Sequence, residues 1–209
     1  MINLFAVCVV IFMVLVLSES LHRKKLVSIE ISRKLVHIFS GVIVAFMPFF
    51  ASWREIQILG LAFIGVILIS KKLKIFRSIH AVERVTSGEI LFAVAITTLA
   101  ILEPKVWIFT ISILHLAVAD SMAAIVGVRW GKVTSYKLFG NKKSLHGSLA
   151  FLLTSIVIML SAFLTHRNDY NIWYLVVFIP IVLTAIENIS WYGLDNFFIP
   201  VACLYLLNL

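Results

Sequence analysis

The sequence is poor in charged residues and in the residues that shape loops and cross-links. Of its 209 residues, 13% are charged, 9 are glycine, 4 are proline and 2 are cysteine. The low charge excludes a water-soluble globule, because a soluble domain of this length exposes more surface than so few charges can keep hydrated. The low glycine, proline and cysteine contents exclude collagen-like, disordered and disulfide-framework proteins.

Apolar residues are abundant instead, at 62% of the chain, with a mean hydropathy of +1.07. Stretches near membrane-spanning length fall at residues 2–17, 35–50, 55–70, 89–102, 106–128, 148–165, 172–187 and 195–208. They predict an all-α fold: a polytopic membrane helical bundle of about eight helices, with seven and nine as alternative counts. We expect one transmembrane domain over residues 1–209.

The positive charges, which give a formal net charge of +8, gather in a few connections. With the first helix retained and its N-terminus outside, the connections that face the cytoplasm are 18–34, 71–88, 129–147 and 188–194. The first three hold fifteen of the eighteen Lys and Arg residues, and the others are Arg54, Lys105 and Arg167. Such an excess on cytoplasmic loops is typical of membrane proteins, so the charge requires no nucleic-acid partner.

Polar residues collect at the cytoplasmic helix ends in five groups. In the first, Glu30, Arg33, Lys34 and His37 follow a spacing that places them on one helical face. Basic side chains there also suit an interfacial anchor. An anchor does not need His37, however, which lies about one turn inside the apolar run.

The second and third groups place acids at or inside apolar helices. Gly88 and Glu89 follow Ser87, a pattern that an ordinary helix N-terminus also explains. Asp120 lies within an apolar run, where a carboxylate costs about 2.5–3.5 kcal/mol and therefore needs a partner or a function. We favour Mg²⁺ binding over an interhelical polar pair.

The fourth group is a glycine-containing basic loop that ends at a helix start. Its members are Arg129, Gly131, Lys132, Lys142, Lys143, Ser144 and Gly147. Backbone N–H groups, cationic side chains and a helix N-terminus together suit a phosphate. A generic basic loop is the alternative, because the Walker A pattern is absent.

The fifth group is acidic. Glu187 and Asn188 precede Gly193, Asp195 and Asn196, and no Lys or Arg lies between them. Together with Asp120, these acids supply oxygen ligands for a hydrated divalent metal. The five groups on one membrane face are the parts that phosphoryl or nucleotidyl transfer to a lipid requires.

One family carries these motifs in the same order. They read Arg33-Lys-x-x-His37, Gly88-Glu89, Asp120-x-x-Ala-x-x-x-Gly127-x-x-x-Gly131-Lys132, Lys142-Lys143-Ser144-x-x-Gly147-Ser148-x-Ala150 and Glu187-x-x-Ser190-x-x-Gly193-x-Asp195-Asn196-x-x-x-Pro200. Over residues 30–201 the chain resembles the polyprenol kinase family, which includes dolichol, phytol and farnesol kinases and CTP-dependent diacylglycerol kinases. The chain resembles the short members of the family, so the lipid cannot be carried over from the long dolichol kinases.

The resemblance implies Mg²⁺-dependent transfer of a γ-phosphoryl group, from CTP or else ATP, to a lipid alcohol. The nucleotide and its phosphates would be bound by Arg129, Gly131, Lys132, Lys142, Lys143, Ser144, Gly147 and Asn196. Catalysis is expected from Asp120, Glu187, Asp195 and His37, with the three carboxylates as metal ligands. The supporting residues would be Glu30, Arg33, Lys34, Gly88 and Glu89. His37 and Asp120 are the candidate general bases.

Two other functions remain open. Phosphatidate cytidylyltransferases share part of the pattern but end in two aspartates that flank an arginine, whereas here Gly193-Leu-Asp195-Asn196 has one aspartate and no arginine, which favours the kinase. A proton- or ion-coupled transporter would use Asp120 at the midplane and would show inverted repeats. We expect a multi-pass protein of a bacterial, archaeal or organelle membrane, with its active site on the cytoplasmic side. Its oligomeric state stays open.

Overall fold

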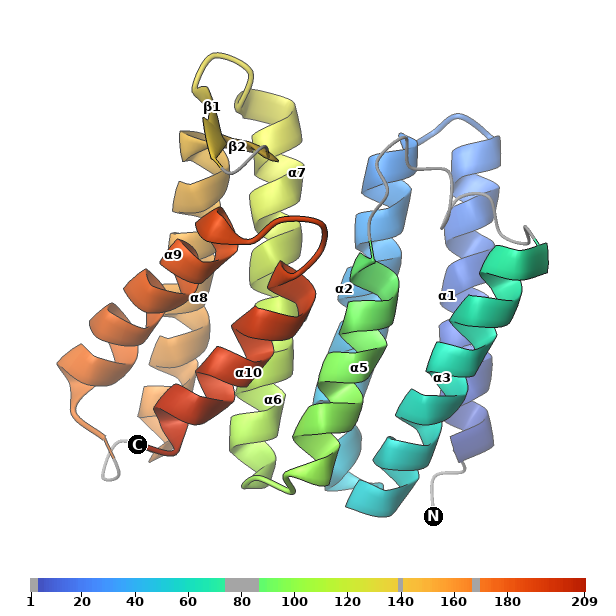
Figure 1. The fold of residues 1–209 in the computed structure, drawn as a ribbon, viewed down its shortest axis with the longest axis horizontal. Coiled ribbons are helices and arrows are strands. Elements are labelled where there is room, and N and C mark those ends of the chain that lie inside the picture. The colour runs from blue at the N-terminus through green and yellow to red at the C-terminus, as the bar shows by residue number, and fades with distance from the viewer. Residues whose placement is uncertain (1–3, 74–86, 139–140, 167–169) are drawn as a thin grey trace.

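The structure, a computed structural model, describes residues 4–73, 87–138, 141–166 and 170–209 (Figure 1). Its helices are α1 (Leu4–Arg23), α2 (Ile29–Phe46), α3 (Trp53–Leu73), α5 (Gly88–Ile101), α6 (Val106–Leu114), α7 (Asp120–Trp130), α8 (Leu145–His166), α9 (Ile179–Ile189) and α10 (Asp195–Leu207). Three shorter helical segments are η1 (Met47–Phe49) and the π-helical η2 (His115–Ala119) and η3 (Tyr174–Phe178). Every predicted apolar stretch is helical, which confirms the all-α bundle.

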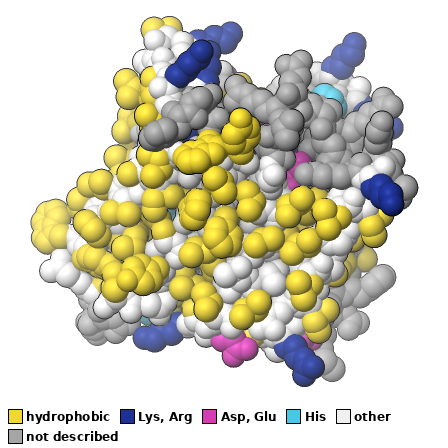
Figure 2. Space-filling view, viewed as in Figure 1, with side chains coloured by type: hydrophobic (Ala, Val, Ile, Leu, Met, Phe, Trp, Pro, Cys, Tyr) yellow, Lys and Arg dark blue, Asp and Glu magenta, His cyan; other side chains and the backbone are white. Residues whose placement is uncertain are grey.

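Among the residues that the structure describes, five helices are long and apolar enough to cross a membrane. They span Ala6–Arg23, Glu30–Phe49, Trp53–Ser70, Val106–Trp130 and Leu145–His166, and three shorter apolar helices span Gly88–Ile101, Tyr174–Ile189 and Asp195–Leu207. Figure 2 shows hydrophobic side chains across the middle of one face, with Lys and Arg toward its two ends. The architecture is that of a polytopic membrane bundle.

The helix from Val106 to Trp130 is the centre of this bundle. Of its residues, 56% are buried inside the bundle, against 11% of the residues in Ala6–Arg23. Phe109, Ile113 and Leu116 have no solvent exposure, and α6 packs against α2, α8 and α10. Asp120 is therefore on the helix that the other helices surround.

A π-helical turn, η2, interrupts this central helix directly before Asp120. His115 Nδ1 donates a hydrogen bond to the Ile111 carbonyl, and its Nε2 accepts one from the Ser155 hydroxyl of α8, both at 2.9 Å. Both nitrogens of this buried ring are therefore satisfied. Single π-turns inside α-helices are rare and occur often at functional sites, and this one directly precedes Asp120.

Two helices extend beyond the apolar stretches that predicted them. The second begins at Ile29, ahead of the stretch that starts at residue 35, because the Ser28 hydroxyl caps it by accepting a hydrogen bond from the Ile31 amide at 3.3 Å. Its charged first turns face the protein rather than lipid, which an apolar run cannot reveal. The first helix likewise extends from its predicted end at residue 17 to Arg23.

The basic loop folds into a hairpin that was not predicted. Strands β1 (Ser135–Leu138) and β2 (Asn141–Ser144) pair antiparallel, with Tyr136 opposite Lys143 and Lys137 opposite Lys142. Opposed residues share a face of the hairpin, so Tyr136 and Lys143 point the same way. Most of the predicted connection 71–88, and Arg167, lie outside the described residues.

Candidate active site

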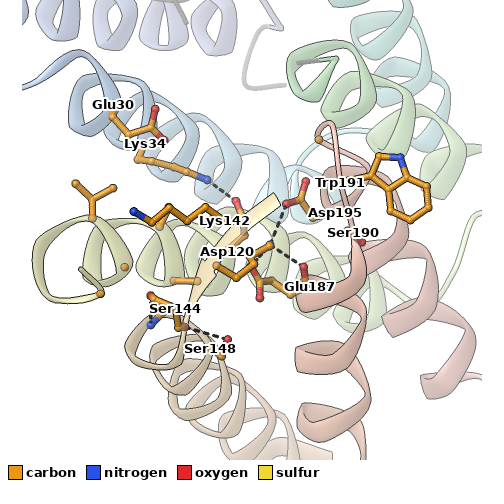
Figure 3. Close-up of a pocket in the computed structure, with 18 of the residues that line it drawn as sticks. Glu30, Lys34, Asp120, Lys142, Ser144, Ser148, Glu187, Ser190, Trp191 and Asp195 are labelled. Atoms are coloured by element: carbon orange, nitrogen blue, oxygen red, sulfur yellow. Dashed lines mark hydrogen bonds and ion pairs between the residues drawn. The ribbon is translucent and has the colours of Figure 1, made fainter. Parts of the chain in front are cut away.

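A cavity of about 970 Å³ opens at the end of the bundle that carries the hairpin. Its walls come from α2, α7, the hairpin, the start of α8, the end of α9 and the turn into α10 (Figure 3). We call it the polar cavity. It brings together Glu30, Arg33, Lys34, Gly88, Asp120, Gly131, Lys132, Lys142, Lys143, Ser144, Gly147, Glu187, Asp195 and Asn196. Residues from all five groups predicted from the sequence thus line one space.

Asp120 pairs with Lys34 across the cavity wall. Lys34 Nζ lies 2.6 Å from Asp120 Oδ2, and the two side chains are 12% and 7% exposed (Figure 3). A carboxylate inside an apolar helix is costly unless it is paired, and Lys34 supplies the opposite charge. Asp120 is therefore part of an interhelical ion pair and also faces the cavity.

Lys143 forms the second buried charge pair. Its ammonium donates to the Glu187 carboxylate and, at 2.7 Å, to the Glu187 main-chain carbonyl, and it lies 3.9 Å from Asp195 Oδ2. Burial alone would lower the pKa of Lys143, but the carboxylates of Glu187 and Asp195 outweigh burial and raise the pKa above its usual value. Lys143 therefore stays protonated at physiological pH.

Ser144 ends the hairpin and begins α8. Its hydroxyl accepts the Gly147 amide at 3.1 Å, the usual bond of a helix N-cap. A Cβ on Gly131 would collide with the Ser144 side chain, and one on Gly127 would lie 3.1 Å from its hydroxyl. The glycines of the basic loop thus seat Ser144 and bring α7 close to α8, so their first role is packing.

The acidic turn packs directly on the start of α5. Gly193 has φ = +87°, and a Cβ there would lie 2.6 Å from the Gly88 backbone. Asn196 Nδ2 donates to the Gly88 carbonyl at 2.9 Å, and the Ser87 amide donates to the Tyr192 carbonyl at 3.2 Å. Two glycines face each other here because neither backbone leaves space for a side chain.

Sequence reasoning missed the aromatic residues of the site. The Tyr136 hydroxyl donates to Asn188 Oδ1, which also accepts the Ser148 hydroxyl at 2.7 Å, so the hairpin is tied to α8 and α9. Trp191 and Tyr192, which belong to the acidic turn, also line the polar cavity (Trp191 is labelled in Figure 3). The signal available was an aromatic pair inside an otherwise polar turn.

Three predicted residues lie outside the polar cavity. His37 and Glu89 line a smaller neighbouring cavity between α1, α2, α3 and α5. Arg129 is exposed, and its guanidinium lies 5.0 Å from the centre of the Trp130 ring, without lining either cavity. The structure therefore does not bring Arg129 to the other phosphate-binding candidates.

Asp120, Glu187 and Asp195 could bind Mg²⁺ only together with water and the phosphates of a bound substrate. Within the described residues, no group of three or more His, Cys, Asp or Glu side chains is arranged to hold a metal ion. Mg²⁺ usually takes one or two carboxylates together with water and substrate phosphates. Glu187 Oε2 is buried without a hydrogen-bond partner. The residues present therefore fit a Mg²⁺ ion that is held by one or two carboxylates together with water and phosphate.

The charge balance of the cavity favours a polyanion. Its lining includes six basic side chains and four acidic ones. Two of the lysines pair with Asp120 and Glu187, whereas Lys132, Lys137 and Lys142 are exposed to solvent. A phosphate chain entering this space meets unneutralised positive charge beside carboxylates that can share a cation.

Comparison with known proteins gives one clear relative. No protein-family model and no solved structure matches the chain. A curated protein named phytol kinase, from Synechocystis sp., is 32% identical over 194 residues, which cover 90% of this chain and 82% of the relative. The chain therefore belongs to the polyprenol kinase family.

Proposed function

We propose that this protein transfers the γ-phosphoryl group of CTP to the hydroxyl of a phytol-type lipid alcohol. Family membership makes it a lipid-alcohol kinase. The polar cavity supports the reaction type, because phosphoryl transfer depends on positioning and charge neutralisation. The observation that carries the proposal is the set of basic side chains beside three carboxylates at one end of an apolar bundle.

The hairpin side of the cavity binds the phosphates. Lys132, Lys137 and Lys142 present exposed ammonium groups to the cavity, and the N-terminus of α8 adds a positive dipole end. Trp191, at the opposite edge, offers a flat apolar surface for the base of the nucleotide (Figure 3).

The acids organise the transfer. Glu187 and Asp195 would hold Mg²⁺, and Asp120 completes the acidic wall. Bound there, the ion would neutralise charge that develops on the phosphates. In the absence of nucleotide, Lys34 pairs with Asp120 and Lys143 pairs with Glu187, which holds these two carboxylates in place.

The chemistry is a single in-line displacement. The hydroxyl oxygen of the lipid bonds to the γ-phosphorus while the bond from that phosphorus to the β–γ bridging oxygen breaks. The hydroxyl proton leaves to a neighbouring acceptor, and the products are a lipid monophosphate and a nucleoside diphosphate. We assign this reaction to the cytoplasmic side, because Arg33, Lys34 and the lysines of the hairpin, which line the site, belong to two of the connections rich in Lys and Arg.

The test uses purified protein in detergent with Mg²⁺ and a panel of lipid alcohols and phosphatidate. CTP and ATP are supplied with label in either the γ- or the α-phosphate. We expect γ-label in the lipid with CTP, and slower transfer at a CTP concentration below KM in the Lys142→Met variant but not in Lys24→Met, a control at an exposed position outside the cavity. Transfer of α-label with release of pyrophosphate would make the protein a cytidylyltransferase, and no transfer of either label would overturn the kinase.

A further inference from the structure

A second cavity, of about 130 Å³, lies beside the polar cavity among α1, α2, α3 and α5, in the right half of Figure 1. Its apolar lining is Leu15, Val36, Phe63, Val66, Ile67 and Phe92. Val66, which lines the cavity, is also 57% exposed on α3, so at this residue the cavity wall is one side chain thick toward the apolar surface of the bundle. A hydrocarbon chain from the lipid would enter there.

The two cavities meet at four residues that line both, namely Arg33, Lys34, Gly88 and Asn196. One side of this junction is lined by six apolar side chains together with four serines, His37 and Glu89, and the other is the charged cavity with the Lys34–Asp120 pair. A ligand that fills both sides must carry an apolar body and a polar end. Among the substrates of a lipid-alcohol kinase, only the acceptor has that form.

His37 stands in the smaller cavity at the level of the junction. Its Nε2 lies 3.2 Å from the Leu116 carbonyl, which can only accept, so the ring nitrogen there carries the hydrogen. In the neutral ring the lone pair is then on Nδ1. Phe92 lies against the ring, with 4.6 Å between ring centres. His37 thus has one nitrogen fixed by the backbone and the other available to accept a hydrogen bond from a hydroxyl group.

We propose that this second cavity, the acceptor cavity, binds the hydroxyl end of a single-chain lipid alcohol, with His37 Nδ1 accepting the hydroxyl hydrogen bond. The inference rests on the proposed function and adds the acceptor's place and its class. A volume of about 130 Å³ is well below the roughly 300–1,000 Å³ of sites for drug-sized ligands. It suits the end of one chain, whereas the hydroxyl carbon of 1,2-diacylglycerol is attached to a glycerol backbone that carries two ester-linked chains, which this volume does not accommodate.

Blocking the side opening tests the location. Val66→Trp places a large ring at the outer wall of the acceptor cavity, whereas Leu68→Trp, also on the exposed side of α3, does not line it. We expect Val66→Trp to raise KM for the lipid alcohol about tenfold, equal to 1.4 kcal/mol, with KM for the nucleotide unchanged. Equal lipid KM values for the two variants would overturn the location.

Two substitutions distinguish the roles of the two ring nitrogens of His37. Asn places an acceptor near the position of Nδ1, and Gln places a donor near that of Nε2. We expect His37→Asn to keep a lipid KM closer to wild type than His37→Gln does. The reverse order would mean that His37 serves only to hold Leu116 in place, and would remove it from the acceptor site.

Photocrosslinking provides a readout that needs no turnover. A single-chain alcohol with a diazirine near its hydroxyl should label α2, α3 or α5 in wild type and lose that label in Val66→Trp. Label confined to α8 or α9 would overturn the acceptor cavity even if the kinase activity is present. Absence of γ-label transfer would instead overturn the proposed function, and diacylglycerol turnover equal to that of single-chain alcohols would overturn the proposed class.

Discussion

The two sides of the site differ in what they present to a ligand. The hairpin side, formed by α7, α8, β1 and β2, carries exposed lysines and closely packed glycines. The side formed by α1, α2, α3 and α5 carries a smaller, mainly apolar-surfaced cavity and the half-buried His37. The difference indicates a division between phosphate binding and lipid binding, with the Lys34–Asp120 pair at the boundary.

The largest expected effect is at this boundary. Asp120→Asn should lower turnover by about 100-fold or more, because a charge aimed at the reacting groups is lost while the volume is kept. It also leaves Lys34 buried without its partner, which costs about 3–5 kcal/mol in soluble proteins. The Lys34→Met/Asp120→Asn double variant separates the effects: thermal unfolding in detergent should recover toward wild type while turnover stays low. Recovery of turnover would limit the pair to a structural role.

Lys143 tests the hairpin side through its pH dependence. Because its pKa is raised on folding, its ion pair stabilises the folded state below the ordinary lysine pKa of 10.5, and this contribution is lost as pH rises through the higher folded-state value. The difference in unfolding temperature between wild type and Lys143→Met should therefore shrink as pH rises above about 10.4. A difference that does not shrink above that pH would contradict the charged pair.

The glycines offer a matched comparison within one residue type. Gly131→Ala forces a Cβ against Ser144 and should destabilise the protein by about 1–3 kcal/mol and lower activity. Gly65→Ala, in α3, meets nothing within 4 Å and should be neutral or stabilising by about 0.5–1 kcal/mol. Unfolding curves of the two variants check this, and equal losses would show that the Ser144 contact is not what requires glycine.

The smallest effect is expected at Arg129. Arg129→Gln should change KM for the nucleotide by less than about threefold, or 0.7 kcal/mol, since its guanidinium stacks on Trp130 outside both cavities. Steady-state kinetics with varied nucleotide measures it. A change as large as that of Lys142→Met would place Arg129 in the phosphate site after all.

Much of this molecule follows from its sequence because membranes impose simple rules. Apolar length predicts the helices, and polar residues at helix ends predict the cavity lining. The hairpin could not be predicted, because its four-residue polar strands are held by Tyr136 and Lys143 contacting α9, far along the chain. The acceptor cavity could not be predicted either. Leu15 and Val66 lie far from His37 in the sequence and have no distinguishing pattern there, but the fold places all three around one cavity.

The most direct test of the division between the two sides is a crossed kinetic experiment. Nucleotide and lipid alcohol are varied in turn for wild type, Lys142→Met and Val66→Trp. We predict that Lys142→Met raises KM for the nucleotide alone and that Val66→Trp raises KM for the lipid alone. If each variant raises both KM values equally, the two sides do not divide the substrates between them.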